Sequence, residues 1–157
     1  MSKTAILFAA LATLLAAPLA AQDINADPTY ETVSLAGGFP DDPYVVSLQS
    51  GGPLDASGLG GACAGFIAEA PDVRLHFAPG SLPLIISVAS AADTTLVINA
   101  PDGNWYCNDD GEASLNPSIA FGSPMEGRYE IWVGTYGNAV IEPADLHALS
   151  GKVGMFV

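Results

Sequence analysis

Basic residues are almost missing from this chain. Of its 157 residues only four are lysine or arginine, against 17 aspartate and glutamate, which gives a formal net charge of −13. Such an excess of negative charge repels phosphate backbones and anionic lipid headgroups, so it argues against nucleic-acid and membrane-surface partners. Two interpretations of the acidity remain open, solubility outside the cell and the binding of a cation.

Histidine is scarce, and the motifs of hydrolases are missing. His76 and His147 are the only histidines and belong to no HExxH pattern, so no zinc ligand set is present. No G-x-S-x-G motif occurs, and His76 alternates with Leu75 and Phe77, which predicts that it points to solvent. We therefore predict no catalytic residue. A carboxylate pair of the glycosidase type stays open as an alternative, because acidic residues are plentiful.

An apolar run long enough for a membrane span is missing as well. Lys3 is followed by an apolar stretch from Ala5 to Leu15, and small residues precede Gln22. This stretch is shorter than the ~20 residues that cross a bilayer, and it has the three-part layout of a secretory signal peptide. We predict that residues 1–21 are removed after Ala21 and that the protein is periplasmic or secreted, without a membrane anchor.

Cysteine occurs only twice, at Cys63 and Cys107, both beyond the predicted signal peptide. An even number of cysteines in an exported chain indicates a disulfide bond. Their wide separation excludes a CxxC metal or redox motif. A bridge closing such a loop would stabilise the fold by about 4 kcal/mol in the chain-entropy model. The alternative is a pair of buried free thiols.

Helical periodicity is absent, and 17 glycines and 12 prolines leave no room for a long helix. Apolar residues instead recur at every second position, for example in Tyr44–Gln49, Val73–Phe77 and Arg128–Val133, which is typical of strands with one buried face. Asp102–Gly103 lies between an apolar strand and Trp105–Cys107, which predicts a hairpin.

About eight or nine short strands between turn signals predict a single small antiparallel β-sandwich, jelly-roll-like and closed by one disulfide. We expect this domain to span residues 30–157 and a flexible polar leader to span residues 22–29. A helical turn is expected within residues 53–59. Residues 143–149 are compatible with either a strand or a short helix.

Four motifs suggest a family. Asp93–Ile98 is a strand opening on Asp, Pro101–Asn104 is a D-G turn, and Asn108–Gly111 is an acidic segment, followed later by a Gly-x-Tyr strand at Gly127–Val133. Together they resemble the pre-peptidase C-terminal domain family, small β-sandwiches carried by many secreted bacterial proteins. The resemblance implies the company of a peptidase. This chain has no room for one beside the module, so peptidase activity would belong to a separate partner.

The acidic segment is also a candidate calcium site. If the two strands of the predicted hairpin pair, Asp93 lies at the same end of the sheet as Asp109, Asp110 and Glu112. Calcium takes six to eight oxygen ligands, and carboxylates from two adjacent loops can supply several. Some members of the resembled family bind calcium at such strand ends. The alternative is a solvated acidic turn.

One aromatic residue is a candidate ligand contact. Trp132 shares the polar side of its strand with Glu130, which predicts a ring able to contact a glycan or a protein. The alternative is that another segment covers it, because tryptophan is highly buried on average. Trp105 and Tyr106 flank Cys107, so we expect them to pack over the disulfide.

These features favour a non-catalytic extracytoplasmic module that binds an unknown protein or glycan and is stabilised by calcium. The alternatives are a small secreted hydrolase, associated with peptidases, and a structural component of the cell surface or matrix.

Overall fold

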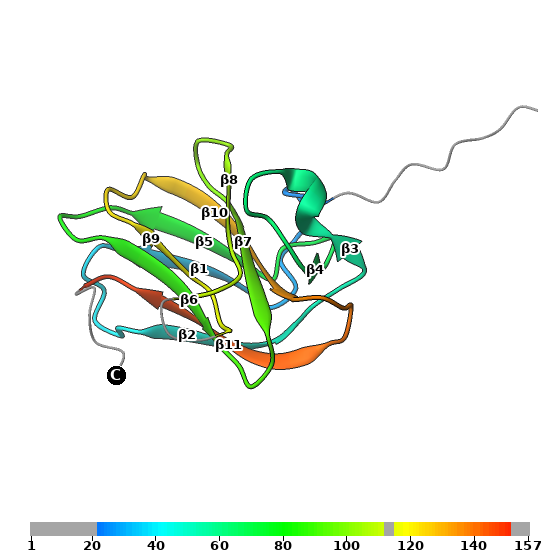
Figure 1. Ribbon diagram of the computed structural model, residues 1–157. Coiled ribbons are helices and arrows are strands. Elements are labelled where there is room, and N and C mark those ends of the chain that lie inside the picture. Colours follow the sequence, from blue (N-terminus) through cyan, green and yellow to red (C-terminus); the bar gives the residue numbers. More distant parts are fainter. Residues whose placement is uncertain (1–21, 112–114, 152–157) are drawn as a thin grey trace, which may run out of the picture.

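The computed structural model describes residues 22–111 and 115–151 as two β-sheets packed face to face (Figure 1). The predicted signal peptide and Glu112 lie outside the described residues. The first sheet contains β1 (Glu31–Ala36), β3 (Leu54–Asp55), β4 (Phe66–Ile67), β5 (Val73–Ala78), β7 (Thr94–Asn99), β8 (Trp105–Asn108) and β10 (Gly127–Thr135). The second contains β2 (Tyr44–Ser50), β6 (Leu84–Ala89), β9 (Ser118–Phe121) and β11 (Glu142–Leu149). The predicted all-β sandwich is confirmed.

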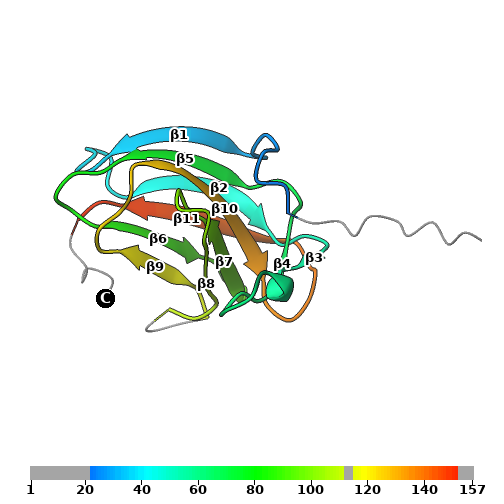
Figure 2. The same cartoon turned by 90° about the horizontal axis from the view of Figure 1, so that it is seen from above.

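Strand β10 organises the first sheet. Its first half pairs with β5 and its second half pairs with β7, while β1 joins β5 as the parallel member of an otherwise antiparallel arrangement. The second sheet is antiparallel throughout, in the order β2-β11-β6-β9. Figure 2 shows the same two layers from above. This pairing gives each sheet one face toward the core and one face away from it.

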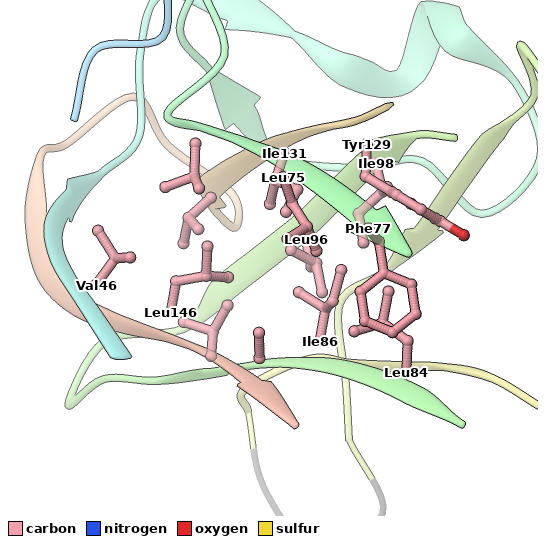
Figure 3. Packing of buried hydrophobic residues seen from close by; sticks show 14 of the residues in the cluster. Val46, Leu75, Phe77, Leu84, Ile86, Leu96, Ile98, Tyr129, Ile131 and Leu146 are labelled. Carbon is pink, nitrogen blue, oxygen red and sulfur yellow. The ribbon is translucent and has the colours of Figure 1, made fainter. Parts of the chain in front are cut away.

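The core lies between the sheets because the strands alternate as the sequence predicts. In β5, Val73, Leu75 and Phe77 are buried, and His76 between them is exposed. Figure 3 shows apolar side chains of the two sheets facing one another, with Leu75 and Ile131 on one side and Ile86 and Leu146 on the other. Burial of such side chains is the main favourable contribution to folding, about 25 cal/mol per Å² of apolar surface.

The turns and shorter elements follow the sequence in part. The Asp102–Gly103 hairpin is confirmed, with Gly103 at φ +77° between paired strands β7 and β8. The expected helical turn is a 3-10 helix at Ala56–Leu59, and residues 143–149 form the strand β11. The sequence does not predict β3, β4 and β9, because strands of two to four residues are too short to show a clear alternation of apolar and polar residues.

The leader at residues 22–29 is tied to the first sheet, although its polarity predicts a mobile segment. Asp23 N donates to Glu69 O at 2.9 Å, and Thr29 N donates to Pro71 O at 2.8 Å. Arg74 Nη2 donates to Ala26 O at 2.8 Å. The backbone of the leader therefore finds hydrogen-bond partners on the domain, which hydropathy alone does not reveal.

Candidate functional site

The two outer faces of the sandwich differ, because the first sheet's face is covered over β7 and the second half of β10. We call residues 53–67, which contain β3, η1 and β4, the flap; it lies over the outer side of β7 and β10 (Figure 1). Ala56, Cys63 and Ile67 of the flap pack against Val97 and Trp132 of the sheet. A second, smaller hydrophobic core thus forms outside the sandwich.

The disulfide bond fastens the flap. Cys63 and Cys107 are bonded, with their Cα atoms 4.8 Å apart, so the bridge predicted from the sequence is confirmed. It joins the flap to β8 at the edge of the first sheet. Close packing also requires glycine. At Gly65, with φ +83°, a Cβ would lie 2.6 Å from the side chain of Thr95 on β7.

Trp132 lies under the flap and is not a ligand contact. Its side chain is 0% exposed, and its ring centroid is 5.5 Å from that of Trp105, beside the disulfide. The ligand-binding interpretation is therefore wrong, and the alternative of burial is correct. Alternation along β10 places Trp132 on the outer face, but the covering segment is distant in sequence and cannot be read from that strand.

The flap's neighbours include a buried charge cluster. Glu130, on the same face of β10, is 1% exposed. Its Oε1 lies 2.6 Å from Arg74 Nε and 2.9 Å from Arg128 Nε. These contacts compensate the desolvation of the carboxylate, so two of the few cations of the chain serve an internal role.

Asp72 is a second buried acid on this sheet. Its Oδ2 accepts a hydrogen bond from Val133 N at 2.7 Å. The pairing of β10 with β5 ends at Ile131 and Val73. The N–H of Val133, two residues further along β10, therefore donates to the Asp72 carboxyl in place of a backbone carbonyl of β5. Burial raises the pKa of Asp72 from 3.8 to about 7, against the opposing effect of the hydrogen bond.

Three of the four candidate calcium residues lie at one end of the sheet, as the sequence predicts, and Glu112 is outside the described residues. Asp93 precedes β7, and Asp109 and Asp110 follow β8, at the same end of this antiparallel pair. Partial burial and then the charges of Asp110 and Asp109 raise the pKa of Asp93, so the three carboxylates interact. In residues 22–111 and 115–151, however, no group of three acidic, histidine or cysteine side chains could hold a metal ion. Calcium binding stays a prediction that depends on Glu112.

The histidines lie on opposite sides of the molecule. His76 is exposed on the outer side of β5 in the first sheet, and His147 is half-buried on the outer side of β11 in the second. The core separates them, so they cannot act together on one substrate.

The outer face of the second sheet is uncovered. Most of its outward residues are not buried, and Ile85 is the buried exception. The outward residues that are not buried are Val45, Ser47, Gln49, Ser87, Ala89, Ser118, Ala120, Pro143, Asp145, His147 and Leu149. We call this set the open face. Asp145 is its one acidic residue, and its Oδ1 accepts a hydrogen bond from Ser47 Oγ at 2.6 Å. A surface with a single acidic residue therefore occurs on a strongly acidic protein.

A shallow groove of about 590 Å³ lies at one end of the open face. Tyr30, Gln49, Ser90, Pro143 and Asp145 are among the residues that line it. Ser90 Oγ donates to Pro143 O at 2.7 Å, which fixes one wall of the groove between the end of β6 and the start of β11.

Fold and surface together define a disulfide-closed, all-β sandwich with one covered and one open face. Neither a protein-family model nor a curated protein matches the chain, so the resemblance to the pre-peptidase C-terminal family stays a prediction. Among solved structures, the chain is similar to the periplasmic lysozyme inhibitor of g-type lysozyme from Aeromonas hydrophila, with a TM-score of 0.39, 13% identity, and coverage of 76% of this chain and 96% of that chain. Within the described residues, no helix is long and apolar enough to cross a membrane.

Proposed function

We propose that this protein is a non-catalytic module that acts outside the cytoplasm by binding a protein partner. The observation that carries the proposal is the contrast between the two outer faces. The flap and the leader cover the outer side of the first sheet around β7 and β10 and leave Ser34 and His76 exposed, whereas the open face presents small polar and apolar side chains with one acid among them. Charged residues are typically depleted at the centre of protein interfaces, which fits this surface.

A protein partner fits the open face better than a glycan. Sugar binding usually relies on exposed aromatic rings that stack on the sugar. The open face contains no aromatic residue, and Trp132 is buried under the flap on the other side of the molecule. Apolar residues such as Val45, which is 46% exposed, can instead be covered by a protein surface.

The alternative of a hydrolase has one geometric point in its favour. Ser87 and His147 are cross-strand neighbours on the open face, and Asp145 lies two residues from His147 on the same side of β11. A catalytic triad needs a hydrogen bond from the nucleophile to the base and from the base to the carboxylate. Asp145 accepts from Ser47 instead, and no hydrogen bond among the described residues joins His147 to Ser87 or Asp145. We therefore favour binding.

Export through a cleaved signal peptide is part of the proposal. The disulfide bond supports it, because such bonds form and persist in oxidising compartments. The acidic composition supports it as well, because a high net charge keeps an exported protein soluble.

Binding and turnover should be measured in parallel on the exported protein. The binding panel consists of purified cationic and anionic proteins, including a g-type lysozyme, and the substrate panel consists of peptides and glycans. We expect salt-sensitive binding to cationic proteins, because opposite charge speeds association and salt screens it. We expect no turnover by the protein or by its His147→Ala variant. Turnover that His147→Ala or His76→Ala abolishes would show that the protein is a hydrolase.

A further inference from the structure

We infer that the free edge of β2 binds an extended, basic segment of the partner protein, which joins the second sheet as an additional strand. This inference rests on the proposed function, since it states how one part of a partner is held. An added strand would lie beside β2 and would continue the open face outward.

Strand β2 lies at the edge of the second sheet and lacks the usual protection of edges. It pairs with β11, and within the described residues it has no strand on its other side. Its sequence, YVVSLQS, contains no charged residue and no proline. Natural edge strands are commonly protected by charges, proline or bulges, because their unpaired backbone groups recruit other strands.

The Tyr30 side chain shows which way the backbone groups of β2 point. Gln49 N donates to Tyr30 Oη at 3.0 Å, and Tyr30 Oη donates to Gln49 O at 3.4 Å. The backbone of Gln49 therefore faces away from β11. Backbone direction alternates along a strand, so the N–H and C=O groups of Ser47 and Val45 also face away from β11. The Tyr30 hydroxyl thus forms hydrogen bonds with both the N–H and the C=O of Gln49. The backbone of an incoming strand would form hydrogen bonds of the same kind with the N–H and C=O groups of Ser47 and Val45.

The other sheet edges are less suitable. β9 has only four residues, against the seven of β2. β8 also has four residues, and the disulfide joins it to the flap. β1 carries Glu31, whose Oε1 accepts a hydrogen bond from Tyr44 Oη at 2.6 Å. β2 is thus the longest uncharged edge.

Charge identifies the occupant as basic. Asp41 and Asp42 lie just before Pro43, which precedes β2, and Asp145 lies opposite Ser47 on β11. A second copy of this chain carries the same net charge of −13, so like-charge repulsion disfavours self-association at this edge. Lysine or arginine side chains on alternate positions of an extended segment can reach these carboxylates while the backbone pairs with β2.

The test uses a blocked synthetic peptide that alternates lysine and valine over the length of β2. Amide hydrogen exchange and chemical shifts are followed by NMR in the natural protein. On peptide addition we expect the amides of Val45 and Ser47 to become protected from exchange, since both face outward. Val46 and Leu48 should be protected already, because they pair with β11. This readout needs no substitution and so does not depend on how a variant folds.

Proline at an outward position supplies the matched comparison. Ser47→Pro removes one outward N–H, whereas Ser47→Ala removes the same hydroxyl and keeps the N–H. We expect Ser47→Pro to weaken the peptide by about tenfold or more, and Ser47→Ala to bind like the natural protein. Val45→Pro, with Val45→Thr as its control, repeats the comparison if Ser47→Pro does not fold.

Three results would overturn the inference. They are no protection of Val45 and Ser47 at millimolar peptide, proline variants that bind the peptide as tightly as the natural protein does, or a peptide with glutamate in place of lysine that binds as tightly as the lysine peptide. Binding of cationic proteins without protection at β2 would remove this inference and leave the proposed function intact. Turnover in the substrate panel would instead remove the proposed function.

Discussion

At the scale of single residues, Asp72 illustrates how one side chain can complete a sheet. Its carboxyl accepts from Val133 N where the pairing of β10 with β5 stops. An unsatisfied backbone N–H at this buried position would be unfavourable by about 1–3 kcal/mol. The same burial makes the charged form of the carboxyl unfavourable, so this residue links stability to pH.

We expect Asp72→Asn to remove part of the pH dependence of stability. The pKa of Asp72 rises from 3.8 to about 7 on folding, so the folded state is favoured when the group is protonated. Its contribution is complete below about pH 4 and is lost as pH rises through 7. The loss is on the order of 4 kcal/mol at most. The Asp72→Asn side chain keeps an oxygen that can accept from Val133 N, so the variant should be more stable than the natural protein at pH 8.

Urea unfolding at several pH values between 4 and 8 measures this effect. The difference between the two proteins should grow with pH, since other acidic residues affect both proteins alike. Parallel curves across this range would contradict the account of Asp72.

Glu130 and its two arginines provide a second residue-scale prediction. Arg74 is 13% exposed and Arg128 is 41% exposed at the side chain, and both contact the same buried carboxylate. Arg74→Ala should lower the free energy of unfolding by about 3 kcal/mol, because it leaves a buried charge poorly compensated. Arg128→Ala is the matched control and should have an effect of about 1 kcal/mol or less, because that pair is more exposed. Equal effects of the two substitutions would disprove this division of roles.

At the scale of elements, the flap is held by the disulfide and by the small core around Trp132. Cys63→Ser combined with Cys107→Ser avoids a free thiol and should lower the free energy of unfolding by about 4 kcal/mol, since the unfolded chain gains entropy. Urea unfolding tests this change. Tryptophan fluorescence should shift to longer wavelength if the flap loosens before the sandwich unfolds. An unchanged unfolding midpoint would show that the bridge does not stabilise the flap.

The loops at the end of β7 and β8 carry the calcium prediction. Burial and then the charges of Asp110 and Asp109 raise the pKa of Asp93, so the three carboxylates repel one another in the absence of a cation. Calcium added to chelator-treated protein should raise the melting temperature with the logarithm of free calcium above the dissociation constant. Asp109→Asn/Asp110→Asn should abolish the rise. A melting temperature unmoved by millimolar calcium would leave a solvated acidic turn.

Alternation in the sequence predicts the longer elements because each such strand has one side in the core. It identifies β2, β5 and β10, and the D-G turn identifies the hairpin of β7 and β8. It does not identify the flap, whose strands have two residues each and whose contacts with Trp132 join distant parts of the chain. The sequence also predicts that Asp93, Asp109 and Asp110 lie near one another, because the tight turn of the β7–β8 hairpin fixes which strand ends meet.

At the scale of the whole molecule, the proposed function rests on which face is covered. No strand pattern reveals this, because the outward residues of both sheets mix polar and apolar side chains, such as Glu130 and Trp132 in the first sheet and Ser47 and Val45 in the second. Glu130 and Trp132 look exposed by alternation and are buried, whereas Val45 and Ala89 lie on a face that is not covered. Composition predicts the extracytoplasmic setting, but only the packing of the flap distinguishes the two faces.

The most direct measurement of the central claim places a charge on the open face. Ala89→Arg puts a cation beside Asp145 on the second sheet, and Ser34→Arg puts the same charge on the exposed outer side of β1. Dissociation constants for a cationic protein that binds the natural protein are measured for both variants, at matched stability. We expect Ala89→Arg to weaken binding by about tenfold or more, through repulsion and steric obstruction at a desolvated surface, and Ser34→Arg to weaken it far less. Equal weakening by the two variants would show that overall charge, and not the open face, holds the partner.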